Sequence, residues 1–131
     1  MPSFDEVEVG TELPPGRFPI DRATLVRYAG ASGDFNPIHW NARFATEVGL
    51  PDVIAHGMFT LALAARYVDE LLGEPGRIAQ LGAKFTRPVV VPEDGTEVTV
   101  AGTWRDDRTL ALTVTCRGET VLGNPVAVVR A

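Results

Sequence analysis

The chain has 131 residues, of which 45% are hydrophobic and 22% are charged, and its formal net charge is −5. This length can enclose one ordinary hydrophobic core, so we expect a single domain over residues 1–131. The 12 basic residues are scattered and form no stripe that could follow a phosphate backbone, so we expect no nucleic-acid partner.

The first half of the chain carries helical signals. Residues 1–10 contain acidic side chains and no basic stretch followed by an apolar one, so we expect no secretory signal. Asp21 is placed as an N-cap, and one face at helical spacing follows it until Gly33, which predicts a short amphipathic helix. The predicted buried face consists of Leu25, Tyr28, Ala29 and Ser32.

A second brief helix is expected between Asn41, which can cap it, and Gly49. Phe44 and Val48 share one face of this helix and are expected to be buried.

The third helical segment runs from about Gly57 to Leu72 and ends at Gly73. It is apolar on most of its circumference, which predicts a helix wrapped by other elements. Because it is interrupted by charged residues and is shorter than the roughly 20 residues that cross a bilayer, we expect no membrane span.

The second half of the chain alternates apolar and polar residues with the period of a β-strand. The alternation covers residues 98–104 and 110–116, with tight-turn residues at 106–108 and 117–118. Two more strands are expected, one from Ile78 to Phe85 and a final one from Val126 to Val129. An antiparallel sheet curled around one long apolar helix accounts for these elements economically. This α+β arrangement has the outline of a hot-dog fold, although other folds fit the pattern too.

The segment SGDFNPIHW between the first two helices places an acid and an imidazole five residues apart. Pro37 disfavours helix at Asn36 and fixes its own φ, so we expect a stiff, specifically shaped loop. Asp34 and His39 could then face one cavity as an acid–base pair. They could also serve structure alone, Asp34 as a turn cap and His39 as a hydrogen-bonded core histidine.

Two motifs together carry a resemblance to a known family. The pattern GDxNPxH begins at Gly33, and AHGM follows at residues 55–58. In this combination the chain resembles, over essentially its whole length, the MaoC-like dehydratase family, which includes the (R)-specific enoyl-CoA hydratases. Within the family, SGDFNPIHW and VIAHGM are most similar to the catalytic B subunit of the (3R)-hydroxyacyl-ACP dehydratase from the type II fatty-acid synthase that extends mycolic-acid precursors. The resemblance implies a single MaoC-like hot-dog domain.

The resemblance also implies a hydro-lyase that interconverts (3R)-3-hydroxyacyl and trans-2-enoyl thioesters of CoA or of acyl-carrier protein. The positions that match the family's acid and histidine, Asp34 and His39, would bind and activate the water that is added or removed. This chemistry needs both a base and an acid, because the C2 proton is poorly acidic and hydroxide is a poor leaving group. We assign the C2 proton to His39 and the departing water to Asp34, with the reverse sharing left open.

Three further residues are expected to support the pair. Gly57 opens the central helix, where free N–H groups and the helix dipole favour an enolate oxygen, and its missing side chain gives a thioester room to approach. Tight packing is the alternative role for this glycine. Asn36 is expected to hold the loop through its amide, and His56 to fix the turn into the helix. Other nearby apolar side chains are expected mainly in the core, some of them lining an acyl tunnel: Tyr28, Phe35, Trp40, Met58 and Phe59.

The single cysteine, Cys116, cannot form an internal disulfide and suits a core position on a strand. It is typical of a reducing cytoplasm, where we expect the protein. Outside the proposed pair, only His56 and Cys116 remain as histidine or cysteine ligands, so no metal or redox cofactor is predicted.

A dimer of hot-dog domains is expected, because one small domain leaves a sheet edge exposed and cannot enclose an acyl-pantetheine arm alone. The partner could be a second copy or a hot-dog paralogue. Two rival functions are a hot-dog acyl-CoA thioesterase and a partner subunit that completes a heterodimeric dehydratase. Against the first, the acids Asp69 and Glu70 lie at the far end of the central helix. Against the second, the Asp34 and His39 pair is intact.

Overall fold

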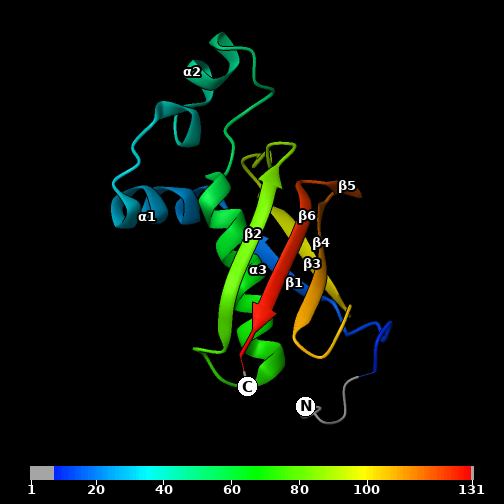
Figure 1. Ribbon diagram of the computed structural model, residues 1–131. Helices are drawn as coiled ribbons and strands as arrows, with labels where there is room; N and C mark the ends of the chain where they lie inside the picture. Colours follow the sequence, from blue (N-terminus) through cyan, green and yellow to red (C-terminus); the bar gives the residue numbers. More distant parts are fainter. Residues whose placement is uncertain (1–7, 131) are drawn as a thin grey trace.

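The computed structural model describes residues 8–130, in which a curled sheet lies against one long helix (Figure 1). The N-terminal residues 1–7, where no secretory signal was expected, and residue 131 lie outside the described part. In chain order the elements are β1 (Gly16–Ile20), α1 (Arg22–Ser32), the 3-10 helix η2 (Pro37–His39), α2 (Ala42–Glu47), α3 (Gly57–Leu72), β2 (Ile78–Phe85), β3 (Thr96–Trp104), β4 (Thr109–Cys116), β5 (Glu119–Thr120) and β6 (Leu122–Val129).

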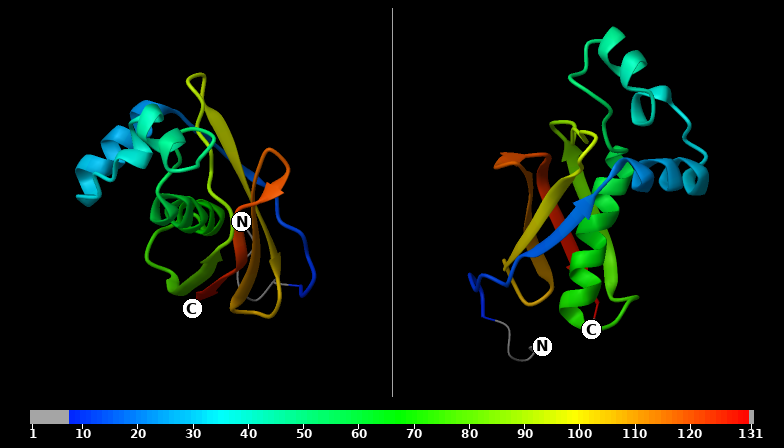
Figure 2. Two further views of the ribbon diagram at one scale, coloured as in Figure 1. Left: turned by 90° about the horizontal axis from the view of Figure 1, so that it is seen from above. Right: turned by 180° about the vertical axis from the view of Figure 1, so that it is seen from behind.

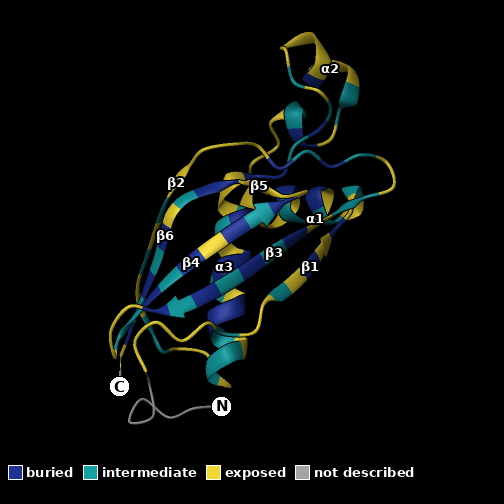
Figure 3. Cartoon of the chain, turned by 90° about the vertical axis from the view of Figure 1, so that its right-hand side faces the viewer, coloured by how far each residue is buried: buried dark blue, intermediate teal, exposed yellow. Residues whose placement is uncertain are grey.

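The strands form one antiparallel sheet in the order β1-β3-β4-β6-β2, with the short β5 paired to β4. The β3–β4 ladder runs without a break from Val98 opposite Cys116 to Trp104 opposite Leu110. Figure 3 shows buried and less buried residues alternating along both strands, as their sequences predict. The sheet therefore has one inner face, which packs on the core, and two edges, β1 and β2.

Helix α3 lies against the inner face of the sheet (Figure 2) and buries Leu63, Ala64, Tyr67 and Val68. The sequence predicted a helix wrapped by other elements, and this is only partly correct. Residues four positions apart share one face of a helix, and one such face of α3 points away from the sheet. The exposed stripe consists of Met58, Ala62, Arg66 and Glu70. No helix within residues 8–130 combines the length and apolarity that a membrane span requires.

Between β1 and α3 the chain leaves the sheet and forms α1, η2 and α2, and α2 projects well beyond the end of the sheet (Figure 1). Helix α1 begins at the predicted N-cap Asp21 and ends at Gly33, whose φ of 77° suits a residue without a side chain. Its predicted buried face is only half correct, because Leu25 and Ala29 are buried whereas Ser32 is exposed.

Helix α2 begins at the predicted cap, Asn41, whose side chain accepts the N–H of Phe44. The residue that it buries is Ala45, and the expectation for Phe44 and Val48 is wrong, since they are 37% and 55% exposed. The reason is its place on the projecting segment, where no sheet lies behind the helix to cover a large apolar face.

Candidate active site

The loop between α1 and η2 is held in shape by its own polar groups. Ser32 Oγ accepts the N–H of Asp34 (3.1 Å), and Asp34 Oδ1 accepts the N–H of Asn36 (3.2 Å). The amide oxygen of Asn36 in turn accepts the N–H of Ile38 (3.2 Å) and so caps η2, which begins at Pro37. The stiff loop predicted from the sequence is therefore present, with Asn36 holding it together.

The chain returning toward α3 completes the site from the other side. Ile54 donates its N–H to the carbonyl of Ile38 (3.0 Å), and its own carbonyl oxygen lies 2.6 Å from Nδ1 of His39. Ala55 continues the link by donating to the carbonyl of Val89 (2.9 Å). The histidine is thus fixed by a segment that also binds the main body of the fold.

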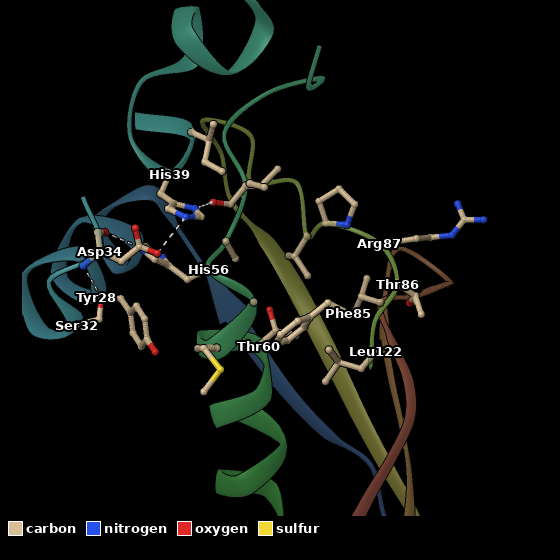
Figure 4. Close-up of a pocket in the computed structure, with 18 residues that line it drawn as sticks. Tyr28, Ser32, Asp34, His39, His56, Thr60, Phe85, Thr86, Arg87 and Leu122 are labelled. Atoms are coloured by element: carbon tan, nitrogen blue, oxygen red, sulfur yellow. Dashed lines mark hydrogen bonds and ion pairs between the residues drawn. The ribbon is translucent and has the colours of Figure 1, made fainter. Parts of the chain in front are cut away.

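Asp34 and His39 face each other across this site (Figure 4), with 3.7 Å between Oδ2 of the acid and Nε2 of the ring. His39 is 6% exposed, whereas the Asp34 side chain is 53% exposed. Because the Ile54 carbonyl can only accept, Nδ1 of His39 must carry a proton. In the neutral ring, Nε2 therefore holds a lone pair on the side of Asp34, which is the arrangement of a base beside an acid.

Burial is the main influence on the protonation of His39 and lowers its pKa below that of an ordinary histidine. The neighbouring His56 lowers the pKa further, whereas the hydrogen bond to Ile54 and the charge of Asp34 oppose the shift. The net effect keeps His39 neutral, and able to take a proton, at a lower pH than an exposed histidine.

His56 connects both members of the pair. Its ring stacks on His39 with 3.6 Å between centroids and 19° between planes, and it is only 2% exposed. Its Nε2 donates to the main-chain carbonyl of Asp34 (3.1 Å), and the ring of Tyr28 lies 4.8 Å away on centroids. His56 therefore contacts both the ring of His39 and the backbone of Asp34, and its supporting role stays a prediction.

A pocket of about 640 Å³ opens beside the pair. Buried apolar side chains form much of its wall, and exposed residues just after β2, Thr86 and Arg87, also line it. The residues that line it further in include Ala55, Thr60, Val89, Val121 and Leu122. A largely apolar cavity with a few polar groups at one end is the usual form of a small-molecule site.

Gly57 is the first residue of α3 and lines the same pocket. Within residues 8–130 its N–H has no hydrogen-bond acceptor, as the geometry of a helix start leads one to expect. A β-carbon at this position would lie 3.0 Å from the ring of Phe85. Gly57 thus has an N–H without an acceptor among the described residues and lies close to Phe85, and the choice between a donor role and a packing role stays a prediction.

Several side chains expected in the core are exposed instead. Phe35, Trp40 and Met58 are 62%, 51% and 58% exposed, because the first two lie in the projecting segment and Met58 lies on the open stripe of α3. The indole N–H of Trp40 nevertheless has a structural role, since it donates to the carbonyl of Phe35 (2.9 Å) and so links the two ends of the segment 35–40.

Other pocket residues could not be identified from the sequence, and they come from the interior of α3, the end of β2 and the chain just after it, and the start of β6: Thr60, Phe85, Thr86, Arg87 and Leu122. None of them belongs to a motif, and only the pairing of β2 with β6 and the packing of α3 bring them to the pair.

Potential metal ligands meet at one place within the described residues, where atoms of Asp34, His39 and His56 lie within 4.8 Å of one another. The two imidazole rings are stacked nearly parallel, so their in-plane lone pairs do not converge on one ion. The geometry suits proton transfer better than metal binding.

Together, the curled sheet around α3 and the Asp–His loop at the start of that helix define a hot-dog domain. The family model for the MaoC like domain matches residues 6–120, and the chain belongs to this family.

Relatives of known name agree with this membership. The chain is 40% identical over 73 residues to the 3-hydroxyacyl-thioester dehydratase X of Mycobacterium tuberculosis, a match that covers 56% of this chain and 25% of that protein. The chain thus spans only about a quarter of that relative. Among solved structures, the R-hydratase PhaJ1 from Pseudomonas aeruginosa superposes with a TM-score of 0.83 at 29% identity, covering 98% of this chain and 84% of that one. The (R)-hydratase from A. caviae involved in PHA biosynthesis superposes with a TM-score of 0.80 at 28% identity, and the match covers 95% of this chain and 96% of that one.

Proposed function

We propose that this protein is a hydro-lyase that reversibly dehydrates (3R)-3-hydroxyacyl thioesters to trans-2-enoyl thioesters. The observation that carries the proposal is the Asp34 carboxylate 3.7 Å from Nε2 of His39, at the wall of a largely apolar pocket. Membership of the MaoC-like family supports it, as do relatives named as a 3-hydroxyacyl-thioester dehydratase and as R-hydratases.

In the dehydration direction, Nε2 of His39 takes the C2 proton, and the electron pair of the C–H bond becomes the new C2–C3 double bond. His39 passes this proton to the Asp34 carboxylate across their 3.7 Å gap. The C3–O bond breaks, and the hydroxyl leaves as water with the proton from Asp34, which returns both groups to their starting state. The reverse sharing of protons also balances, and hydration runs the same steps backward.

Removal of the C2 proton places negative charge on the thioester oxygen, which requires a donor that is already oriented. The N–H of Gly57 is our candidate, because it has no acceptor among the described residues, lies at the positive end of a 16-residue helix, and belongs to a residue that lines the pocket. Asn36 and His56 support the pair through the contacts described above, and neither needs to touch the substrate.

The rival thioesterase would need a carboxylate near the pocket on α3. The acids of this helix are at its other end, where Glu70 pairs with Arg66 (2.8 Å) and neither Asp69 nor Glu70 lines the pocket. An assay with crotonyl-CoA separates the possibilities. Loss of the enoyl absorption without free thiol indicates hydration, release of thiol indicates hydrolysis, and activity only after mixing with a second hot-dog protein indicates an obligate heterodimer.

We further propose a dimer, with the edge strand β2 as the contact. Among the described strands, β2 pairs with β6 alone, and its residues are exposed or half-buried. The pocket lies at the end of this edge, beside Phe85 and Arg87, so a second domain along β2 would add a wall to it. A homodimer carries two Asp34/His39 sites, whereas a heterodimer with a silent partner carries one, and light scattering with active-site titration distinguishes them.

The substrate carrier and acyl length belong to the same proposal. The motif resemblance to the catalytic B subunit of a type II fatty-acid synthase dehydratase makes acyl-carrier-protein thioesters a substrate to test beside CoA thioesters. Rates across enoyl chain lengths, with and without candidate partners, measure both preferences. We propose that residues 1–131 act as one domain in the cytoplasm, in keeping with the unpaired, buried thiol of Cys116.

A further inference from the structure

Thr60 is a buried polar residue of the pocket that neither motif contains. It lies on α3 one turn after Gly57, is 3% exposed, and lines the pocket. Among residues 8–130 its hydroxyl forms no hydrogen bond, and its oxygen is not one of the fully buried polar atoms that lack a partner, so the oxygen is open to the pocket. A hydroxyl that opens on a cavity without a protein partner can donate to water in the free protein and to a ligand when one is bound.

The usual intrahelical partner of this hydroxyl is already occupied. A threonine inside a helix commonly donates to the carbonyl four residues earlier, which here belongs to His56. That carbonyl accepts two N–H groups, from Phe59 (3.0 Å) and from Thr60 itself (3.2 Å). A carbonyl oxygen has two lone pairs, so both are in use and the hydroxyl is available to the pocket.

The position of Thr60 indicates which ligand atom it would meet. Residues three apart share a helix face, so Thr60 and Gly57 line the pocket together. Figure 4 shows Thr60 below the Asp34 and His39 pair, beside Phe85. When the C3 oxygen of the substrate lies at the pair, the thioester carbonyl, two carbons away, is the polar group left to face α3.

We propose that the Thr60 hydroxyl donates a hydrogen bond to the thioester carbonyl oxygen of the substrate, as a second donor beside the N–H of Gly57. The inference rests on the proposed hydro-lyase function and adds a catalytic residue to it. Because the oxygen gains charge as C2 loses its proton, this hydrogen bond strengthens in the transition state and acts on kcat more than on KM.

Two substitutions separate the effect of the hydroxyl from the effect of the shape of the side chain. Thr60→Val keeps the branched side chain and removes the hydroxyl, whereas Thr60→Ser keeps the hydroxyl and removes the methyl group. With crotonyl-CoA, Thr60→Val should lose about 10- to 100-fold in kcat, the range for a hydrogen bond to a charged group. Thr60→Ser should stay within several-fold of the parent, and Thr113→Val, an exposed position on β4 outside the pocket, should match the parent.

Infrared spectroscopy of bound butyryl-CoA gives a readout that a merely structural role would not change. This thioester lacks both the double bond and the hydroxyl, so its carbonyl stretch reports the proposed contact alone. The stretch should lie at lower frequency on the parent protein than in water, and most of this shift should be lost in Thr60→Val. The melting temperature of Thr60→Val should not fall, since the hydroxyl has no partner to lose in the described part of the chain.

A folded Thr60→Val protein with parental kcat overturns the inference, as does an unchanged carbonyl frequency. Equal losses in Thr60→Val and Thr60→Ser also overturn it, because shape rather than the hydroxyl would then matter. If Thr60→Val does not fold, the frequency shift in Thr60→Ser decides, since it must persist. A parent protein without hydratase activity refutes the proposed function instead, and the butyryl-CoA spectrum then still tests the contact at Thr60.

Discussion

Replacing Asp34 by asparagine should remove most of the activity while leaving the fold intact. The amide oxygen of Asn can still accept the N–H of Asn36, which is 3.2 Å from Oδ1 of the acid, so the loop keeps its internal hydrogen bond. The side chain is 53% exposed, and we expect the stability to change by less than about 0.5 kcal/mol. The atom facing His39 across 3.7 Å, however, can no longer exchange a proton. General acid–base groups contribute about 10²- to 10⁴-fold to rate, equivalent to roughly 3–5 kcal/mol of the barrier.

The assay follows the enoyl absorption of crotonyl-CoA at saturating substrate, with thermal melting to check folding. A matched control is Asp107→Asn, which changes an exposed acid in the turn between β3 and β4, outside the pocket, and should keep parental kcat. A well-folded Asp34→Asn protein with near-parental kcat would remove Asp34 from the mechanism and with it the proton transfers proposed above.

Gly57→Val should reduce kcat by about 10²- to 10³-fold, the cost of one oxyanion donor, because its side chain would be forced against Phe85 and into the approach to the N–H. Gly30→Val, at a position open to solvent, is its control, and unchanged kinetics in a folded Gly57→Val protein would reject the donor role. In the pH profile of kcat/KM, the midpoint of the acid limb should lie below about pH 6.5, the ordinary histidine value, because burial lowers the pKa of His39. His39→Ala should abolish most of the turnover, whereas an acid limb above pH 6.5 would contradict a buried, neutral base. The lowered pKa of His39 also makes the free energy of unfolding depend on pH. The contribution of His39 is present above pH 6.5 and is lost as the pH falls toward the lower pKa of the folded protein. Light scattering should give about twice the 14.1 kDa chain mass, and a fully active monomer would refute the dimer.

Helix caps, strand bounds and the shape of the loop could be predicted from the sequence where they depend on residues that are close together in the chain. The caps Asp21 and Asn41 act within three residues of their own position, and both were predicted. The strand from Ile78 to Phe85 was predicted with its observed bounds. The loop that brings Asp34 toward His39 is likewise shaped by groups only a few residues apart, so a motif could indicate it.

Features that depend on packing between distant segments were missed or misjudged. The stack of His56 on His39 joins residues on two separate segments, and nothing in either motif gives its geometry. Thr60 appears in the sequence as one more small residue of an apolar helix, and only the occupied His56 carbonyl marks its hydroxyl as free. Phe44 has the spacing of a buried residue, but the projecting segment gives it nothing to pack against.

The most direct test of the central claim is the reaction of the purified chain with crotonyl-CoA, with analysis of both the product and the free thiol. We expect the enoyl absorption to disappear without thiol release and the product to be (3R)-3-hydroxybutyryl-CoA, formed slowly or not at all by Asp34→Asn and His39→Ala. Release of free CoA, formation of the (3S) product, or no reaction even with a second hot-dog subunit present would contradict the account.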